Sequence, residues 1–308
     1  MKHIFIINAH AGKGNQASQI LTMAEKLRSK YGLDCSCMIT DRPGSAEELA
    51  RRAAAVNDTV RIYACGGDGT LNEVANGIAG LSNAAMTCIP AGTGNDFLRN
   101  FGDDMEKFRD AENLWDGPQF PLDLIDCNGR YALTIACTGI DARIANDVHK
   151  YAGHPFRGGS GSYLTSLTMN FLFKDIGQRW AVTVDGQTLL GEYSLVSVCN
   201  GRYYGGGFMP VPEARMNDGV LDTMIVRGVG RLQFARFVSA YGKGNWRRFP
   251  SLARVVQAQE VRIQSTQEDL VTCLDGECFT SRDVTIRMAD KKVLFFGPQG
   301  CDCNRTAR

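Results

Sequence analysis

The feature that most limits the possible folds is an alternation of short apolar segments with polar turns and helix-forming segments in the first third of the chain. Apolar segments with the length of a buried strand lie at residues 2–7, 34–40, 61–65 and 86–90. Helix-forming segments follow them at residues 17–30, 45–56, 70–78 and from Asp96 onward. Ser45, with Glu48 three residues later, predicts a capping box at the second of these helices. This alternation predicts a parallel, doubly wound α/β sheet with ligands at the carboxyl ends of its strands.

The turn after the third strand combines glycines with one acid. Gly66, Gly67 and Gly69 enclose Asp68, and Thr70 opens the helix that follows. Glycines leave no Cβ in the way, so backbone N–H groups can approach an anion at the positive end of a helix. A bare carboxylate would repel phosphate unless it holds a metal, often through water, or orients a nearby group. We therefore predict a nucleotide phosphate site with magnesium at this turn.

Two other turns fall at the same edge of the predicted sheet. The first strand leads into a polar turn with Asn8, Gly12 and Lys13, although its spacing differs from that of the common phosphate-binding loop. The fourth strand leads into a turn with the residues Gly92, Thr93, Gly94, Asn95 and Asp96. Polar side chains there could cap the next helix or face a ligand, and we favour the ligand because glycines expose them.

The second half of the chain has a different pattern. Short strand candidates separated by turn residues lie at 131–136, 179–184, 193–200, 221–226, 261–265, 270–274, 283–288 and 292–296. Helices are predicted less regularly, at residues 142–150, 163–173 and 232–241. Asp185-Gly186 and Asp218-Gly219 are typical turn pairs. We predict a β-rich sandwich or barrel as the second domain.

Composition excludes several classes of protein. The chain has 308 residues, with 34 basic and 33 acidic side chains and a net charge of +1, which argues against a nucleic-acid partner held by bulk charge. No apolar stretch reaches the 18 or so residues of a membrane span. The 11 cysteines, with no apolar leader at the N-terminus, indicate free thiols in a reducing compartment, so we expect a cytoplasmic protein.

Ordered motifs along nearly the whole chain resemble the soluble bacterial diacylglycerol kinases, which belong to a lipid kinase superfamily with the sphingosine and ceramide kinases. The motifs are GGDGT at 66–70, GTGNDF at 92–97, GIDA at 139–142, Asn200-Gly201 with the glycines at 205–207, PEA at 212–214, Asp218-Gly219 and Asp275-Gly276-Glu277. One departure is Asn8-Ala9, where the family typically has Asn-Pro. Proline there sets backbone shape rather than chemistry.

The resemblance implies an α/β nucleotide-binding domain at 1–124, rejoined by 290–308, and a β-rich lipid-substrate domain at 125–289, with the active site in the cleft between them. It implies a general base at Glu277, since transfer to a hydroxyl needs a proton acceptor. It also implies a structural magnesium held by the Asp218 carboxylate and the carbonyls of Arg215 and Val220, which are oxygen ligands of the kind that magnesium prefers. Asp123 and Asp141 are further candidates on the resemblance alone.

The function expected from these residues is Mg2+-dependent transfer of the γ-phosphoryl group of ATP to a lipid hydroxyl. Diacylglycerol is the family's usual acceptor, while a sphingoid base, a monoacylglycerol or a phosphatidyl lipid stay open. We expect peripheral contact with the inner membrane surface, through a mix of cations and aromatics at residues 243–249, and allow for a homodimer. The alternatives are a NAD kinase-like phosphotransferase, which shares the GGDGT turn, and a non-catalytic nucleotide sensor, which would not need Glu277.

Overall fold

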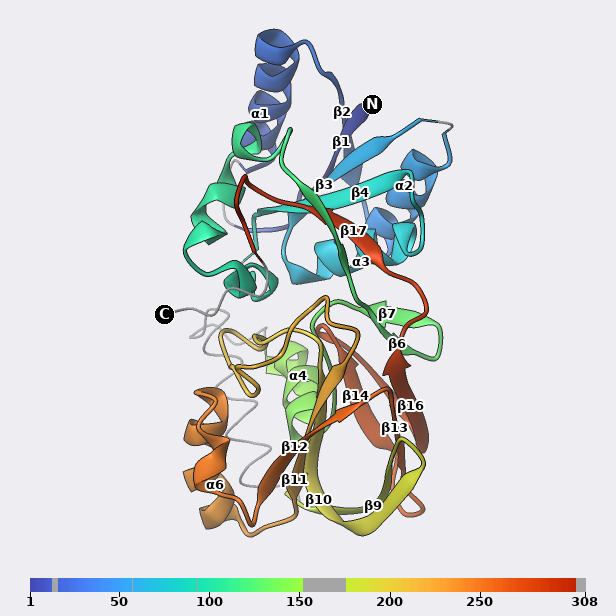
Figure 1. Cartoon of the computed structure of the whole chain (residues 1–308), viewed down its shortest axis with the longest axis vertical. Helices are drawn as coiled ribbons and strands as arrows, with labels where there is room; N and C mark the ends of the chain where they lie inside the picture. Colours follow the sequence, from blue (N-terminus) through green and yellow to red (C-terminus); the bar gives the residue numbers. More distant parts are fainter. Residues whose placement is uncertain (13–15, 57, 93, 152–175, 303–308) are drawn as a thin grey trace. The chain divides into compact units, whose positions relative to one another are not determined.

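The computed structural model describes residues 1–12, 16–56, 58–92, 94–151 and 176–302 (Figure 1). Within them the chain forms two compact units. The first unit comprises Met1–Leu124 and Ala289–Arg308, and the second comprises Ile125–Met288. No helix in the described ranges is long and apolar enough to cross a membrane.

The first unit is built on a six-stranded sheet with the order β2-β1-β3-β4-β17-β5. Its strands are β1 (Lys2–Asn8), β2 (Asp34–Thr40), β3 (Val60–Gly66), β4 (Ala84–Pro90), β5 (Gln119–Leu122) and β17 (Val293–Phe296). Strands β1 to β4 and β17 run parallel to their neighbours, and β5 alone is antiparallel, to β17. The strands predicted in this half are therefore confirmed, and a strand from the end of the chain joins them.

Helices cover this sheet because its central strands are apolar on both faces. Every residue of β3 is buried, which is the usual pattern of a strand in a parallel sheet with helices on each side. The helices are α1 (Gln16–Tyr31), α2 (Ser45–Ala54) and α3 (Asp68–Ile78), and two 3-10 helices follow β4, η1 (Phe97–Arg109) and η2 (Ala111–Asn113). The helix expected from Asp96 is thus a 3-10 segment, interrupted at Gly102 by a positive φ of 57°.

The predicted capping box at the start of α2 is wrong. Gly44 precedes the helix with a φ of 82°, and no side chain of the helix itself caps it. The Glu73 carboxylate, on α3, instead accepts hydrogen bonds from the backbone N–H groups of Gly44 (2.9 Å) and Ala46 (3.0 Å). Glu48 pairs with Arg42. A cap from a neighbouring helix has replaced the local one, which also fastens α2 to α3.

The second unit contains one 11-stranded antiparallel sheet. Its strands are β6 (Ile125–Cys127), β7 (Arg130–Ala132), β8 (Ile135–Gly139), β9 (Gln178–Val184), β10 (Gln187–Cys199), β11 (Leu221–Arg227), β12 (Ala253–Ala258), β13 (Glu260–Gln264), β14 (Leu270–Leu274), β15 (Glu277–Ser281) and β16 (Asp283–Met288). In Figure 1 this sheet curls, most visibly along β9 and β10. The predicted β-rich second half is confirmed, and the strands β6, β12 and β15 lie outside the predicted ranges.

Two apolar cores lie against opposite faces of the curled sheet. Alternation along β10 shows this, because Val196 and Val198 belong to one core and Leu195 and Cys199 to the other. The second core is completed by helices, which are α4 (Ile140–Tyr151), α6 (Arg231–Gly242) and the short η3 (Trp246–Arg248). Helices predicted at 142–150 and 232–241 are confirmed, and the one predicted at 163–173 lies outside the described residues.

Candidate functional site

The turns after β1, β3 and β4 meet at the carboxyl edge of the first sheet. The strands end in register, with Ile7 opposite Cys65 and Gly66 opposite Pro90. Hydrogen bonds then join the turns, because Ala91 N donates to Gly66 O (2.8 Å) and Asn8 Nδ2 donates to Thr70 Oγ1 (3.1 Å). The structure therefore brings together candidate residues from three separate parts of the sequence. Lys13 and Thr93 lie outside the described residues.

Three glycines of these turns, Gly12, Gly66 and Gly92, have no room for a Cβ atom. A Cβ on Gly66 would lie 2.3 Å from Thr70 Oγ1, one on Gly92 would lie 2.6 Å from Gly67 Cα, and one on Gly12 would lie 2.5 Å from Ala91 O. Gly69 is different, since a Cβ there would have no neighbour within 4 Å. Glycine in a helix costs about 1 kcal/mol relative to alanine. Gly69 thus leaves open space beside the first turn of α3 without a packing reason.

Asp68 connects the second turn to the third. Its Oδ2 accepts a hydrogen bond from the Asp96 backbone N–H and its Oδ1 accepts one from Phe97, each at 3.1 Å. Asp96 in turn is buried and pairs with Arg99, with Nε 3.0 Å from Oδ1. Asp68 therefore holds the backbone at the end of the third turn, and its role toward a metal stays a prediction.

Asn95 has a structural task as well. Its φ of 51° places it in the left-handed region, which asparagine tolerates better than most residues. Its side-chain Nδ2 donates to Gly92 O at 2.8 Å, closing the turn on itself. Asn95 therefore shapes the third turn, whatever else its amide oxygen contacts.

Two carboxylates face the same point beside Gly94. A Cβ built on Gly94 would lie 3.1 Å from Asp68 Oδ2 and 3.9 Å from Asp96 Oδ2. The described residues contain no group of three or more His, Cys, Asp or Glu side chains able to hold a metal. Magnesium in nucleotide sites usually takes only one or two carboxylates, with water and phosphate oxygens completing its shell. Asp68 and Asp96 fit that pattern.

The Asp275-Gly276 turn positions Glu277 in the second unit. Both turn residues have positive φ, 45° and 99°, as expected of a two-residue hairpin. The Asp275 carboxylate accepts hydrogen bonds from the N–H groups of Leu133 (2.5 Å), Thr134 (3.1 Å) and Ile135 (3.0 Å). Glu277, the first residue of β15, is 46% exposed and pairs with Arg130. Asp275 therefore anchors the hairpin, and Glu277 keeps an accessible carboxylate.

The Asp218 loop is followed by a buried acid, Asp222, that no sequence motif marks. Asp218 Oδ1 accepts from Val220 N at 3.1 Å, and Gly219 has a φ of 76°. Asp222 is 6% exposed, and burial raises its pKa to about 6, with further contributions from the charges of Asp218 and Glu213. Such an excess of negative charge suits a cation. Asp222 was missed because it lies inside an apolar strand, where its charge has no recognisable motif.

The two remaining candidate acids have protein partners. Asp123 is 1% exposed and forms an ion pair with Lys292, at 2.7 Å. Asp141 accepts hydrogen bonds from the phenols of Tyr241 (2.9 Å) and Tyr204, and burial raises its pKa. Both residues hold local structure in the described chain.

Comparison with known proteins identifies the class to which these features belong. Residues 2–127 match the diacylglycerol kinase catalytic domain, and residues 134–295 match the YegS C-terminal NAD kinase beta sandwich-like domain. The chain belongs to the lipid kinase family that these two domains define.

Individual relatives of the chain are named as lipid kinases or diacylglycerol kinases. The chain is 30% identical to the diacylglycerol kinase of Bacillus subtilis (strain 168) over 274 residues, which is 88% of each protein. It is 32% identical over 218 residues to a Pseudomonas aeruginosa protein named "Probable lipid kinase YegS-like", covering 69% of this chain and 68% of the relative. A crystal structure of a diacylglycerol kinase from Bacillus anthracis str. Sterne has the same fold, with a TM-score of 0.70, 23% identity and 96% of each chain covered.

Proposed function

We propose that the protein transfers the γ-phosphoryl group of ATP to the hydroxyl of a lipid such as diacylglycerol, with Mg2+ as cofactor. The observation that carries this proposal is the convergence of three polar turns at the carboxyl edge of the first sheet, where Gly69 leaves the start of α3 uncovered. An α-helix leaves its first backbone N–H groups without intrahelical partners. Those groups and the helix dipole favour phosphate at this place.

We assign different roles in nucleotide binding to the residues of the three turns. Gly66, Gly67, Gly69 and Thr70 supply backbone next to the phosphates, and Lys13 supplies a cation. We assign further contacts with the nucleotide to Gly92, Thr93, Gly94 and Asn95 of the third turn, and to Asn8 and Gly12 of the first turn. We assign to Asp68 a second task besides holding the third turn, which is to orient magnesium together with Asp96, directly or through water. Bound there, magnesium would offset the charge on the phosphate oxygens.

Glu277 is the proposed general base. Its carboxylate is accessible, lies on a rigid two-residue hairpin and is held by Arg130. The hairpin cannot easily shift, because Asp275 is hydrogen-bonded to the backbone of residues 133–135. A carboxylate placed in this way can accept the proton of an alcohol as the phosphoryl group is transferred.

We propose that a second cation stabilises the Asp218 loop. Its ligands would be the Asp218 carboxylate and the carbonyls of Arg215 and Val220. The buried Asp222 supports this proposal, because burial and, after it, the charges of Asp218 and Glu213 raise the pKa of Asp222, and a cation would relieve the repulsion among these carboxylates.

The acceptor places the reaction at a membrane surface. A lipid alcohol resides in a bilayer, so we propose that the protein is cytoplasmic and contacts the inner membrane surface peripherally. Residues 243–249, with Lys243, Trp246, Arg247 and Arg248 among them, provide a suitable mix of cations and aromatics.

The test of catalysis is Glu277→Gln in the purified full-length chain. The substitution keeps size and most hydrogen bonding, so nucleotide affinity should stay near parental while kcat for diacylglycerol in mixed micelles falls about 100-fold to 10,000-fold. Glu260→Gln is the matched control, since Glu260 is an exposed acid in the same unit. A Glu277→Gln protein that melts normally and retains most of its kcat would place the base elsewhere.

A further inference from the structure

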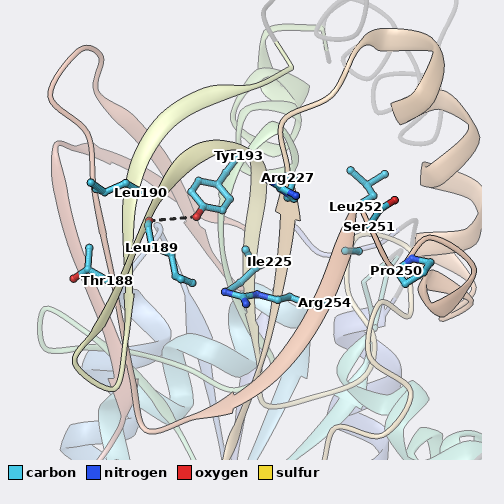
Figure 2. A pocket seen from close by; sticks show the side chains of 11 residues that line it. Thr188, Leu189, Leu190, Tyr193, Ile225, Arg227, Pro250, Ser251, Leu252 and Arg254 are labelled. Carbon is cyan, nitrogen blue, oxygen red and sulfur yellow. Dashed lines mark hydrogen bonds between the residues drawn. The ribbon is translucent and has the colours of Figure 1, made fainter.

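The second unit contains a pocket of about 480 Å³ at the end of its sheet, and none of the candidate catalytic or metal-binding residues lines it. Figure 2 shows that it lies between the β9–β10 hairpin, which carries Thr188, Leu189 and Leu190, and the segment of residues 250–254 at the start of β12. The volume is that of a site for a small molecule or a headgroup.

The pocket exists because two neighbouring strands separate. β10 pairs with β11 from Tyr193 to Cys199, whereas its earlier residues, from Gln187 onward, pair with β9. Within the described chain, no strand continues β11 along the edge of residues 187–192. The side chains of Tyr193, Ile225 and Leu252 close the floor of this gap, and each is at most 7% exposed. The floor is therefore apolar and preformed.

Two arginines flank the apolar floor. Arg227 ends β11 opposite Tyr193, and Arg254, on β12, lies opposite Ile225 (Figure 2). Both are exposed, and neither forms an ion pair or a side-chain hydrogen bond with any residue that the structure describes. Glu192, which precedes the pocket residue Tyr193 in the chain, packs against Gly177 and Gly228 and does not line the pocket. An unneutralised pair of guanidinium groups is well suited to a phosphate.

The charge of residues 227–254, which include both arginines, also favours binding of an anion. Residues 227–254 contain no Asp or Glu, and their basic residues are Arg227, Arg231, Arg236, Lys243, Arg247, Arg248 and Arg254. This segment is strongly basic in a chain whose net charge is only +1. Leu190 at the pocket rim is 82% exposed, and Leu232 on α6 is 69% exposed. Exposed leucines beside basic residues are a pattern of binding to an anionic membrane.

We propose that this pocket binds an acidic phospholipid of a bilayer. Arg227 and Arg254 bind the headgroup phosphate, the first part of an acyl chain lies along Leu189, Ile225 and Leu252, and Leu190 enters the bilayer surface. The proposal commits to a lipid rather than a peptide because the cations are unpaired and the floor is apolar. It does not depend on phosphoryl transfer, since binding is measured without ATP.

The experiment is co-sedimentation of the full-length protein with vesicles of phosphatidylglycerol and phosphatidylcholine, and with vesicles of phosphatidylcholine alone. We expect binding only to the acidic vesicles, and a roughly 30-fold weaker affinity for the double variant Arg227→Gln/Arg254→Gln, the loss expected for two cations at an anionic surface. Leu190→Ser should weaken binding independently of charge. The matched control is Arg262→Gln/Arg282→Gln, which removes two exposed arginines of the same unit that are paired with Asp283 and Asp269.

Each alternative outcome is distinct. Equal losses of vesicle affinity in Arg227→Gln/Arg254→Gln and in the control variant would show that binding depends on bulk charge, and would contradict the proposed role of the pocket. Millimolar inorganic phosphate could compete with vesicle binding as strongly as soluble dihexanoyl phosphatidylglycerol does. That result would show that the pocket binds free anions rather than a lipid. A pocket-dependent dimer on size-exclusion chromatography, without vesicle binding, would assign it to a second copy of the chain. Melting curves of every variant exclude unfolding as the cause.

Discussion

Asp68→Asn is the substitution with the most informative expected outcome, because the structure gives this carboxylate two hydrogen-bonding tasks. Oδ2 accepts from the Asp96 N–H and Oδ1 accepts from the Phe97 N–H, each at 3.1 Å. Asparagine is nearly the same size but has only one oxygen. Its NH2 group must face one of the two backbone N–H groups, so one hydrogen bond is lost and one donor is left unsatisfied.

The expected loss in the free energy of unfolding of Asp68→Asn follows from these contacts. An unsatisfied donor of this kind costs about 1–3 kcal/mol. Removal of a negative charge from the first turn of α3 adds about 0.5 kcal/mol, because that charge interacts favourably with the helix dipole. For a unit of this size each kcal/mol corresponds to about 2–4 °C in melting temperature. We therefore expect Asp68→Asn to lower the melting temperature by roughly 5–10 °C and to weaken nucleotide binding together with turnover.

The assay is a thermal melt followed by circular dichroism, with calorimetric titration of ATP at several Mg2+ concentrations. Asp103→Asn is the control, since Asp103 is an exposed acid of the same unit. A variant that melts at the parental temperature would refute the proposed link between Asp68 and the third turn. Should turnover alone be lost at that unchanged temperature, Asp68 would act only through its charge.

Two further predictions concern residues whose roles the structure separates from packing. Gly69→Ala should leave the free energy of unfolding unchanged or raise it by up to about 1 kcal/mol, since the added Cβ meets nothing within 4 Å and alanine favours a helix, while the ATP dissociation constant rises. An unchanged dissociation constant in the titration would show that phosphate does not approach Gly69. Asp222→Asn tests the acidic loop through pH. Folding raises the Asp222 pKa from 3.8 to about 6. Between about pH 4 and pH 6 the carboxyl group is therefore ionised in the unfolded chain and still protonated in the folded protein. The free energy of unfolding of the parent protein falls as the pH rises through this range, by about 3 kcal/mol at most. The asparagine variant should escape this loss, and Mg2+ should narrow the difference if the loop binds a cation. Denaturation curves that stay parallel from pH 4 to 7 would contradict the raised pKa.

Local sequence patterns were sufficient for the main elements of the fold. The apolar segments that became β1, β2, β3 and β4 each have a strand's length and are bounded by turn residues. The Asp185-Gly186 pair turns β9 into β10 with φ values of 44° and 83°, as such pairs favour. These features depend on residues within a few positions of one another, so periodicity and turn chemistry report them directly.

Contacts between distant residues could not be read in this way. Glu73 caps a helix that begins almost 30 residues earlier, and Asp68 holds backbone groups 28 and 29 residues later. In the sequence these acids look like ordinary members of a helix and a turn. Their hydrogen bonds arise only once the parallel sheet has placed α2, α3 and the third turn side by side.

The sequence by itself determined the alternation of strands and helices, the β-rich second half and the motifs of a lipid kinase, because each is written in neighbouring residues. Tertiary structure alone decided which glycines serve packing and which leaves open space, as the contrast between Gly66 and Gly69 shows. It also decided where charge accumulates, since the raised pKa of Asp222 and the unpaired state of Arg227 and Arg254 depend on burial and on partners far away in the chain. The physical reason is that packing distance and desolvation are properties of atoms brought together by the whole fold.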